Sequence, residues 1–322
     1  MRFLLFTIFG SLLWNTAFAV DTTPINSSGN GALGTYNLIL LEDYNFSGGD
    51  VQGRTFIGGN LNAQGRYAEF GSRLANTNTA IDAVTIVGDV NASGVRVLRD
   101  NNLVYGGALN ASTVELNDGD DGQLIHDPNV TIADIATELY TDTAYYASLS
   151  SNGAYSNGVF NYTGIDEVAV FNVSAIDIFS QNSNLSLNWG AAETVIINVS
   201  ANGFSNNDIV IGGGVNLNNG FTQQSAFSNV LWNFYDAESI NFNGVAMKGS
   251  VLAPFADTSG GASFDGTFAA NSYTGAREFH DFVFNYERPP SIVAVSSPST
   301  GVLLIGALGI LFLRRRGCRG QA

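Results

Sequence analysis

Short apolar stretches, interrupted by glycine, asparagine and aspartate, recur along most of the chain. The stretch from Tyr36 to Glu42 is continuously apolar at its centre, which predicts a buried strand. The second half repeats the pattern, and strands are predicted at Val168 to Val173, Ile176 to Phe179, Leu185 to Trp189, Val195 to Val199, Ile209 to Ile211, Val230 to Phe234 and Ile240 to Phe242. The pattern therefore predicts a mainly β fold.

A glycine that opens a short apolar unit recurs in the first third of the chain. The units are Gly49-Asp50-Val51, Gly59-Asn60-Leu61, Gly88-Asp89-Val90-Asn91 and Gly107-Ala108-Leu109-Asn110. Their spacings, near multiples of ten, indicate coils of about twenty residues that turn at each glycine and bury their apolar faces on one another. This regularity predicts a right-handed parallel β-helix, and a β-sandwich is the alternative.

One segment has a helical period instead. Asp127-Pro128-Asn129 precedes apolar positions spaced as one face of a helix, namely Ile132, Ile135, Ala136, Leu139, Tyr140 and Thr143. We predict a single amphipathic helix from Thr131 to Ser150, with Gly153 beyond its end. It is expected to lie along the solenoid or across one end of it.

The two ends of the chain have the composition of targeting segments. Arg2, an apolar run and Ala17-Phe18-Ala19 are typical of a secretory signal peptide, and an N-terminal anchor is the alternative. Residues 301–313 form an apolar run of about 20 Å that Arg314, Arg315 and Arg316 close, shorter than a bilayer core of about 30 Å. We therefore expect a signal peptide at 1–19, one β-helical domain at 20–287, a linker and sorting motif at 288–300, and a short apolar segment with an Arg-rich tail at 301–322.

Charge and cysteine content argue against several classes of partner and of metal site. Five of the 13 basic residues and none of the 28 acidic residues lie in the two terminal segments, so the body is strongly acidic. This argues against nucleic acid as a partner, because phosphates require a basic surface. The single cysteine, Cys318, lies in the tail, so the body forms no disulfide, and with two histidines it cannot supply three or four His/Cys ligands for zinc.

The opening and closing motifs of the body resemble those of the choice-of-anchor A domain of bacterial surface proteins. The resemblance is carried by Gly49-Asp50-Val51-Gln52-Gly53-Arg54 with Gly58-Gly59-Asn60, by Gly249-Ser250-Val251-Leu252-Ala253-Pro254, and by Glu278-Phe279-His280. The matching positions are Asp50, Arg54, Gly59, Pro254, Glu278 and His280. That family has no settled biochemical activity, so the resemblance implies a location more than a reaction.

The tail resembles the PEP-CTERM sorting signal of Gram-negative bacteria, which an exosortase reads. Pro298, Ser299 and Thr300 precede the apolar run, and the arginine cluster follows it. Ser296-Ser297-Pro298 stands where that family has Pro-Glu-Pro, a departure that concerns the particular processing enzyme. The resemblance implies transient contact with the inner membrane, with the arginines on the cytoplasmic side, and retention at the outer surface or in the extracellular matrix.

Three groups of residues are candidates for chemistry. Glu278 and His280 share one face of a strand, where they are either an acid/base pair or, as we favour, a structural hydrogen bond in the last coil. Asp50 and Arg54 are expected to form a structural contact between coils. Asp118, Asp120 and Asp121 are a weak Ca²⁺ candidate, because position 12 counted from Asp118 is Asn129 and not the Glu of an EF-hand; a solvated acidic turn is the favoured interpretation.

These observations favour an exported structural or adhesion protein of the cell envelope or of a biofilm matrix, without catalysis and without an obligatory cofactor. A polysaccharide-binding or polysaccharide-degrading β-helix is the first alternative, although a single lysine, Lys248, makes a catalytic cleft less expected. Ice binding is the second alternative. It would require threonines that recur at the coil spacing, and Thr77/Thr79 and Thr141/Thr143 do not.

Overall fold

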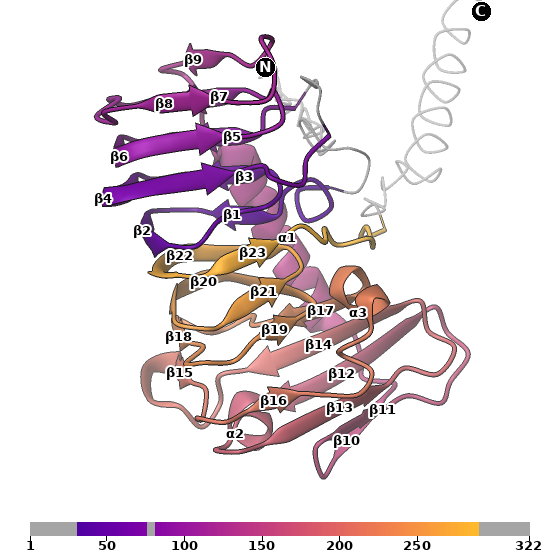
Figure 1. Cartoon of the computed structure of the whole chain (residues 1–322). Helices are drawn as coiled ribbons and strands as arrows, with labels where there is room; N and C mark the ends of the chain where they lie inside the picture. Colours follow the sequence, from indigo (N-terminus) through magenta and orange to yellow (C-terminus); the bar gives the residue numbers. More distant parts are fainter. Residues whose placement is uncertain (1–30, 76–80, 290–322) are drawn as a thin grey trace, which may run out of the picture. The chain divides into compact units, whose positions relative to one another are not determined.

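The computed structural model describes residues 31–75 and 81–289, whose compact unit ends at Glu287 (Figure 1). A first row of ten parallel strands runs through this unit. In spatial order it contains β12 (Val168–Ser174), β14 (Thr194–Ser200), β17 (Val230–Asn233), β20 (Ser250–Ser259), β22 (Phe268–Ala276), β1 (Leu38–Leu40), β3 (Thr55–Ile57), β5 (Val84–Ile86), β7 (Leu103–Tyr105) and β9 (Leu124–His126). The prediction of a mainly β fold is confirmed.

Two further sets of strands pack beside this row. The second row contains β15 (Asp208–Val210), β18 (Ser239–Asn241), the ends of β20 and β22, β2 (Tyr44–Gly48), β4 (Leu61–Phe70), β6 (Val90–Val97) and β8 (Val114–Leu116), all paired in parallel. The third side contains β19 (Met247–Lys248), β21 (Ser263–Asp265) and β23 (Glu278–His280), and a separate sheet of β10 (Ala154–Ser156), β11 (Val159–Asn161), β13 (Asn184–Asn188) and β16 (Asn216–Leu217). Parallel pairing throughout the two long rows does not fit the antiparallel sheets of a β-sandwich.

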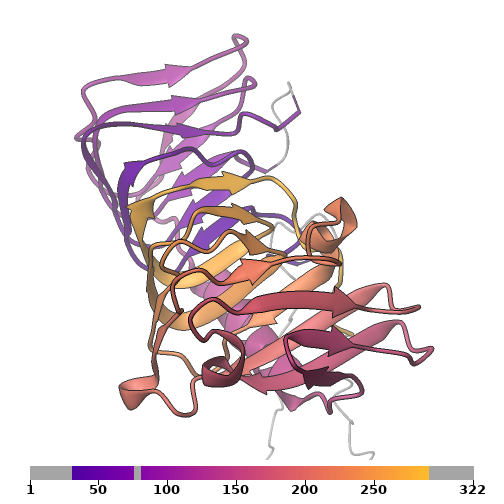
Figure 2. The same cartoon turned by 60° about the horizontal axis from the view of Figure 1, so that its bottom comes forward.

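The chain enters this stack in its middle. Leu38 of β1 pairs with Thr55 of β3 on one side and with Phe268 of β22, far along the chain, on the other. From β1 the coils proceed to β9 at one end, the helix α1 (Ala133–Ser148) runs back along the stack, and the remaining coils return from β12 to β22 (Figures 1 and 2). The first and last coils of the domain therefore join at its centre.

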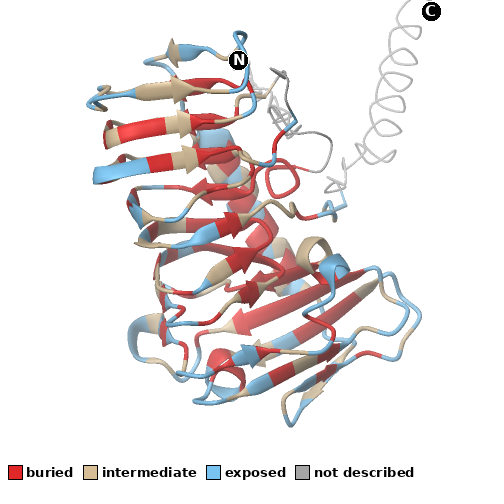
Figure 3. Ribbon diagram, viewed as in Figure 1, coloured by how far each residue is buried: buried red, intermediate tan, exposed pale blue. Residues whose placement is uncertain are grey.

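Helix α1 covers the outer face of the first row. Ile135, Leu139 and Tyr146 pack on a row of outward apolar residues from successive strands, namely Val170, Ile196, Leu231, Leu252, Ala269 and Ile39. Apolar residues that point inward form a second, larger core (Figure 3). The predicted helix is confirmed with narrower bounds, and it lies along the stack; Tyr140, predicted on its buried face, is 41 % exposed and stacks on Phe255 instead.

Below the C-terminal half of α1 the outer face becomes polar. Asn172, Asn198 and Asn233 occupy one register position on β12, β14 and β17, and we call these three residues the inner ladder. Asn198 Nδ2 donates to Asn172 Oδ1 at 2.9 Å, and Asn233 Nδ2 donates to Asn198 Oδ1 at 2.9 Å. The inner ladder also donates to the carbonyls of Thr143, Tyr146 and Leu149, so the amides connect the helix to the sheet.

The glycine units explain one corner of the stack. Asp43 Oδ1 accepts from Asn60 N, Asn60 Oδ1 from Asp89 N, and Asp89 Oδ1 from Ala108 N, each at 2.7 Å. Gly59, Gly88 and Gly107 lie directly against these side chains, so that a Cβ would approach the accepting oxygens to 2.3–2.5 Å. Three of the four predicted units therefore stack at this corner, and Gly49 lies at another turn, against the backbone of Arg277 in the neighbouring coil.

Two predictions for single segments have other outcomes. Ile176 to Phe179 was predicted as a strand and lies largely in a short helix, α2 (Ala175–Ile178), because the chain turns a corner after β12. The signal peptide at 1–19 and the sorting residues Pro298, Ser299, Thr300, Arg314, Arg315 and Arg316 lie outside the described residues. Within 31–75 and 81–289, no helix is both long and apolar enough to cross a membrane.

Candidate functional site

A straight row of outward side chains crosses the second row of strands. Register pairs place eight residues in line, one per strand or coil: Val210, Asn241, Ser259, Thr274, Asn45, Asn62, Asn91 and Asn110. We call these eight residues the outer ladder. Neighbouring strands lie about 4.8 Å apart, so the outer ladder extends about 34 Å. Five of its members are exposed and three are half-buried.

Amide hydrogen bonds connect one half of the outer ladder. Asn45 Nδ2 donates to Thr274 Oγ1 at 3.1 Å, Asn62 to Asn45 Oδ1 at 3.0 Å, Asn91 to Asn62 at 3.1 Å and Asn110 to Asn91 at 2.8 Å. Each bond uses one N–H and one lone pair of an amide that has two of each. Asn62 also donates to Asp43 Oδ2 at 3.2 Å. The remaining donors and acceptors of the other amides are spaced at the strand repeat and can bind an extended polar ligand or ordered water.

Charged side chains flank the outer ladder on the same strands. Arg96 bonds Glu115 at 2.8 Å and Glu69 at 3.1 Å across β4, β6 and β8. Toward the other end, Asp257 accepts from Ser272 Oγ at 2.7 Å. Because these side chains pair across neighbouring strands, they connect the strands on either side of the outer ladder.

A second polar cluster lies on the third side and contains the predicted Glu278 and His280. His280 Nδ1 contacts Asp265, His280 Nε2 lies 3.2 Å from Glu278 Oε2, and Lys248 Nζ contacts the other oxygen of Asp265. Asp265 is 3 % exposed. Both imidazole nitrogens thus face carboxylates, an arrangement that connects β19, β21 and β23 and leaves neither nitrogen directed at a substrate. This geometry favours the structural interpretation of His280.

The opening motif lies beside the closing motif, because Phe279 N donates to the Asp50 carbonyl and Gln52 N to the Phe279 carbonyl. Burial raises the pKa of the Asp50 carboxyl, and the nearby carboxylates of Glu278 and Glu69 raise it further. Arg54 acts instead on Asp281, whose pKa is raised by burial and lowered in part by Arg54 and Arg73. Asp50 and Arg54 thus face different carboxylates, and the expected contact between them gains no support. Pro254 is buried where β20 passes from the first row to the second, a bulge position at which proline is tolerated.

The acidic turn is organised by a residue that the sequence did not single out. Asp100 Oδ1 accepts from the backbone N–H groups of Asp121 and Gly122 at 2.8 Å, and Asp118 Oδ2 accepts from Arg99 N at 3.0 Å. In the part of the chain that the structure describes, no group of three His, Cys, Asp or Glu side chains could hold a metal ion. Calcium binding by Asp118, Asp120 and Asp121 stays a prediction.

Sequence reasoning missed Asp265 and most of the outer ladder. Asp265 lies in Phe264-Asp265-Gly266, one coil before His280, and its role depends on which coils stack. The available signal was an Asn three residues after each stacking glycine, at Asn62, Asn91 and Asn110. It was interpreted as turn composition and not as a row of side chains.

Comparisons with known proteins bear on the whole domain. A family model described as "Putative Ice-binding-like adhesive domain" matches residues 29–281. No curated protein and no solved structure matches the chain. Since the match covers most of the chain and includes both long rows of strands, the chain belongs to the ice-binding-like adhesive domain family.

Proposed function

We propose that this chain is an exported, non-catalytic adhesion domain of the cell surface or extracellular matrix, and that the outer ladder is its binding face. The observation that carries the proposal is the row of eight in-register side chains over about 34 Å, long enough to bind several units of an extended polymer. Family membership is compatible with an adhesive surface protein. An extracellular polysaccharide fits the face, because hydroxyl groups pair with amides without requiring charge.

Binding to the host's own exopolysaccharide tests this proposal. The Asn62→Ala/Asn91→Ala variant should lose most of the binding to the immobilised polymer in a co-sedimentation assay. Asn184→Ala/Asn218→Ala is the matched control, because Asn218 Nδ2 donates to Asn184 Oδ1 at 3.1 Å in an exposed pair on another side of the domain. Equal binding by both variants would remove the outer ladder from the mechanism.

Ice binding is the second candidate function, since the family description names it and a regular polar row can order water. Thr274 is the one threonine of the outer ladder, so the hydroxyl and methyl array expected of such a face is not regular here. Inhibition of ice recrystallisation by the wild type, with loss in the Asn62→Ala/Asn91→Ala variant and no binding to polysaccharide, would favour this candidate.

The proposal also covers the type of β fold and the processing of the C-terminal tail. We infer a right-handed parallel β-helix of the choice-of-anchor A type, which the parallel rows and the stacked glycine corners support. A PEP-CTERM-like tail would be cut near Pro298 by an exosortase-type enzyme after transient contact with the inner membrane. Intact mass of the protein recovered from its host tests the tail: a mass that includes Arg314 to Arg316, in the inner-membrane fraction, would mean a permanent anchor.

A further inference from the structure

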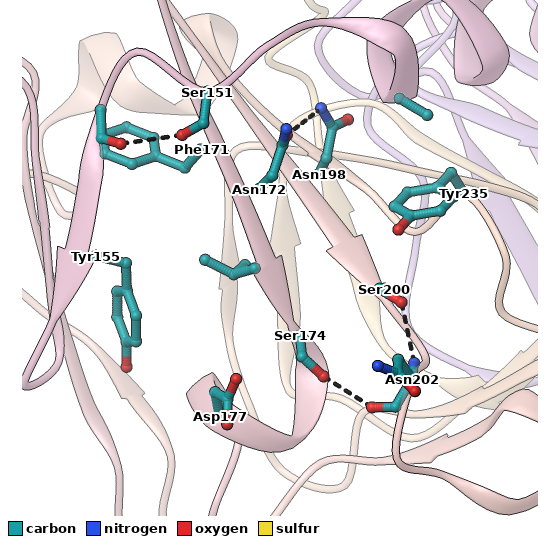
Figure 4. Close-up of a pocket in the computed structure, with 13 residues that line it drawn as sticks. Ser151, Tyr155, Phe171, Asn172, Ser174, Asp177, Asn198, Ser200, Asn202 and Tyr235 are labelled. Atoms are coloured by element: carbon teal, nitrogen blue, oxygen red, sulfur yellow. Dashed lines mark hydrogen bonds between the residues drawn. The ribbon is translucent and has the colours of Figure 1, made fainter.

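An open cavity of about 560 Å³ lies at the β12 end of the stack, on a different part of the domain from the outer ladder (Figure 4). Its floor is the outer face of β12 and β14, with Asn172 and Ser174 beside Ser200. Tyr155 and Asp177 stand on one side of it and Tyr235 on the other. The volume falls within the range of about 300–1,000 Å³ that is usual for small-molecule sites.

The polar groups of this cavity divide into two sets. Asn172 and Ser174 are occupied within the protein, because Asn172 bonds Leu149 and Asn198, and Ser174 donates to the carbonyl of Asn202. By contrast, the Asp177 carboxylate, the side-chain amide of Asn202 and the Tyr235 hydroxyl make no hydrogen bond to residues in the described ranges. Three side chains, one from α2 and two from separate turns, thus bring polar groups without a protein partner to the edge of one space.

The charge of the cavity and the position of the Tyr155 ring indicate which chemical class of ligand fits. Asp177 is the one charged residue among those that line the cavity, so a carboxylate, sulfate or phosphate on the ligand would be repelled. Its proximity contributes to a raised pKa of the Tyr155 hydroxyl, after the larger effect of burial. The Tyr155 ring is held by Phe160 at 4.6 Å and presents an apolar surface beside the polar groups. An uncharged ligand with several hydroxyl groups and one apolar face meets all of these features.

We propose that this cavity binds a neutral sugar residue, with Asp177, Asn202 and Tyr235 accepting from or donating to its hydroxyl groups and Tyr155 against its ring. The site is separate from the outer ladder, so it gives the domain a second, end-on contact with a glycan and does not depend on the function proposed for the face.

Amide chemical shifts of the labelled domain test this assignment. Titration with glucose, galactose, mannose and N-acetylglucosamine should move resonances of the residues that line the cavity for at least one sugar, and glucuronate should bind at least about tenfold more weakly than glucose. Asp177→Ala, at an exposed position on α2, should weaken binding about tenfold or more, and Tyr235→Phe should weaken it less. Asp120→Ala is the matched control and should bind as the wild type does.

Any of three results would overturn the proposal. The first is that none of the four neutral sugars shifts the resonances of the cavity. The second is that the Asp177→Ala and Tyr235→Phe variants, folded by their spectra, bind as tightly as the wild type. The third is loss of binding in the Asn62→Ala/Asn91→Ala variant, because that variant changes the outer ladder alone.

Discussion

The inner and outer ladders contain the same hydrogen bond in two environments. Asn198 and Asn233 of the inner ladder are 2 % and 0 % exposed, and only Asn172 at its end is exposed. In the outer ladder Asn45 and Asn110 are exposed, and Asn62 and Asn91 are half-buried. The amide-to-amide distances are alike, 2.9 Å in the inner ladder and 2.8–3.1 Å in the outer ladder. The difference is the further partner. The inner ladder bonds the backbone of α1 and of Leu149, its C-cap. The outer ladder meets solvent and, at Asn62, the Asp43 carboxylate.

If the outer ladder binds polymer as proposed, one repeated residue serves both stability and binding. A buried amide must satisfy every donor and acceptor within the protein, so the inner ladder determines where α1 lies. An exposed amide can exchange water for a ligand at small cost. The substitutions below are chosen to test that difference, from the largest expected effect to the smallest.

Asn233→Ala should be the most destabilising change. It leaves Asn198 Oδ1 and Thr143 Oγ1 without their partner, and it removes the donor to the Thr143 carbonyl in a fully buried site. We expect a loss of about 3 kcal/mol in the free energy of unfolding, measured as a lower urea midpoint with an unchanged slope. A loss below about 1 kcal/mol would mean that water replaces the missing amide, and the contrast between the ladders would fail.

Thr143→Val should have an intermediate effect. The replacement has nearly the same shape and removes the hydroxyl that donates to Asn233 Oδ1 at 2.6 Å, so a loss of about 1–2 kcal/mol is expected. Thr137→Val is the matched control on the same helix, because Thr137 is exposed and bonds its own helix at Ala133. If both variants lose the same stability in urea, the loss comes from removing a threonine hydroxyl from this helix in general and not from breaking the inner ladder.

The sequence predicted local structure better than it predicted which coils meet. Alternation predicted most strands of the second half, because inward residues such as Val195 and Ile197 are buried wherever their coil stands in the stack. It could not show that β1 pairs with β22, since entry at the middle depends on contacts between residues more than 200 positions apart.

The candidate sites could not be predicted fully from the sequence either, because they join residues from different coils. Glu278 and His280 were recognised from a short motif, but their anchor Asp265 is found only when the coil spacing is known. The cavity depends on residues from α1, β10, β12, β14, α2 and the loop after β17, which share no local pattern. Ile176 to Phe179 has strand composition, yet its place at a corner makes it helical. The short-range sequence pattern therefore predicted helices and strands, whereas the positions of the candidate sites depend on which coils stack on one another.

The buried carboxyl of Asp281 makes the stability of the domain depend on pH. Burial raises the folded-state pKa of Asp281 above its unfolded value, which is about 3.9. The stability that this group contributes is therefore complete below the unfolded pKa and is lost as pH rises through the folded-state pKa. Asp281→Asn removes that titration, so its stability relative to the wild type should increase from about pH 3 to about pH 7.

Urea unfolding at a series of pH values measures this difference. Asp120→Asn, at an exposed position of the acidic turn, is the control and should show a much smaller change over the same range. A stability difference for Asp281→Asn that falls toward neutral pH would show that attraction to Arg54 and Arg73 outweighs burial, which is the opposite of the assigned cause.

The smallest effect on stability is expected where the effect on binding is expected to be largest. Asn62→Ala/Asn91→Ala removes two half-buried rungs of the outer ladder, together with the bond from Asn62 to Asp43. It should cost about 1 kcal/mol or less in urea unfolding, because water can reach and replace these bonds. Its failure to bind polymer would then come from the altered face and not from unfolding. A loss as large as that of Asn233→Ala would mean that the outer ladder is part of the framework of the stack, and the separation between an amide row for stability and an amide row for binding would no longer hold.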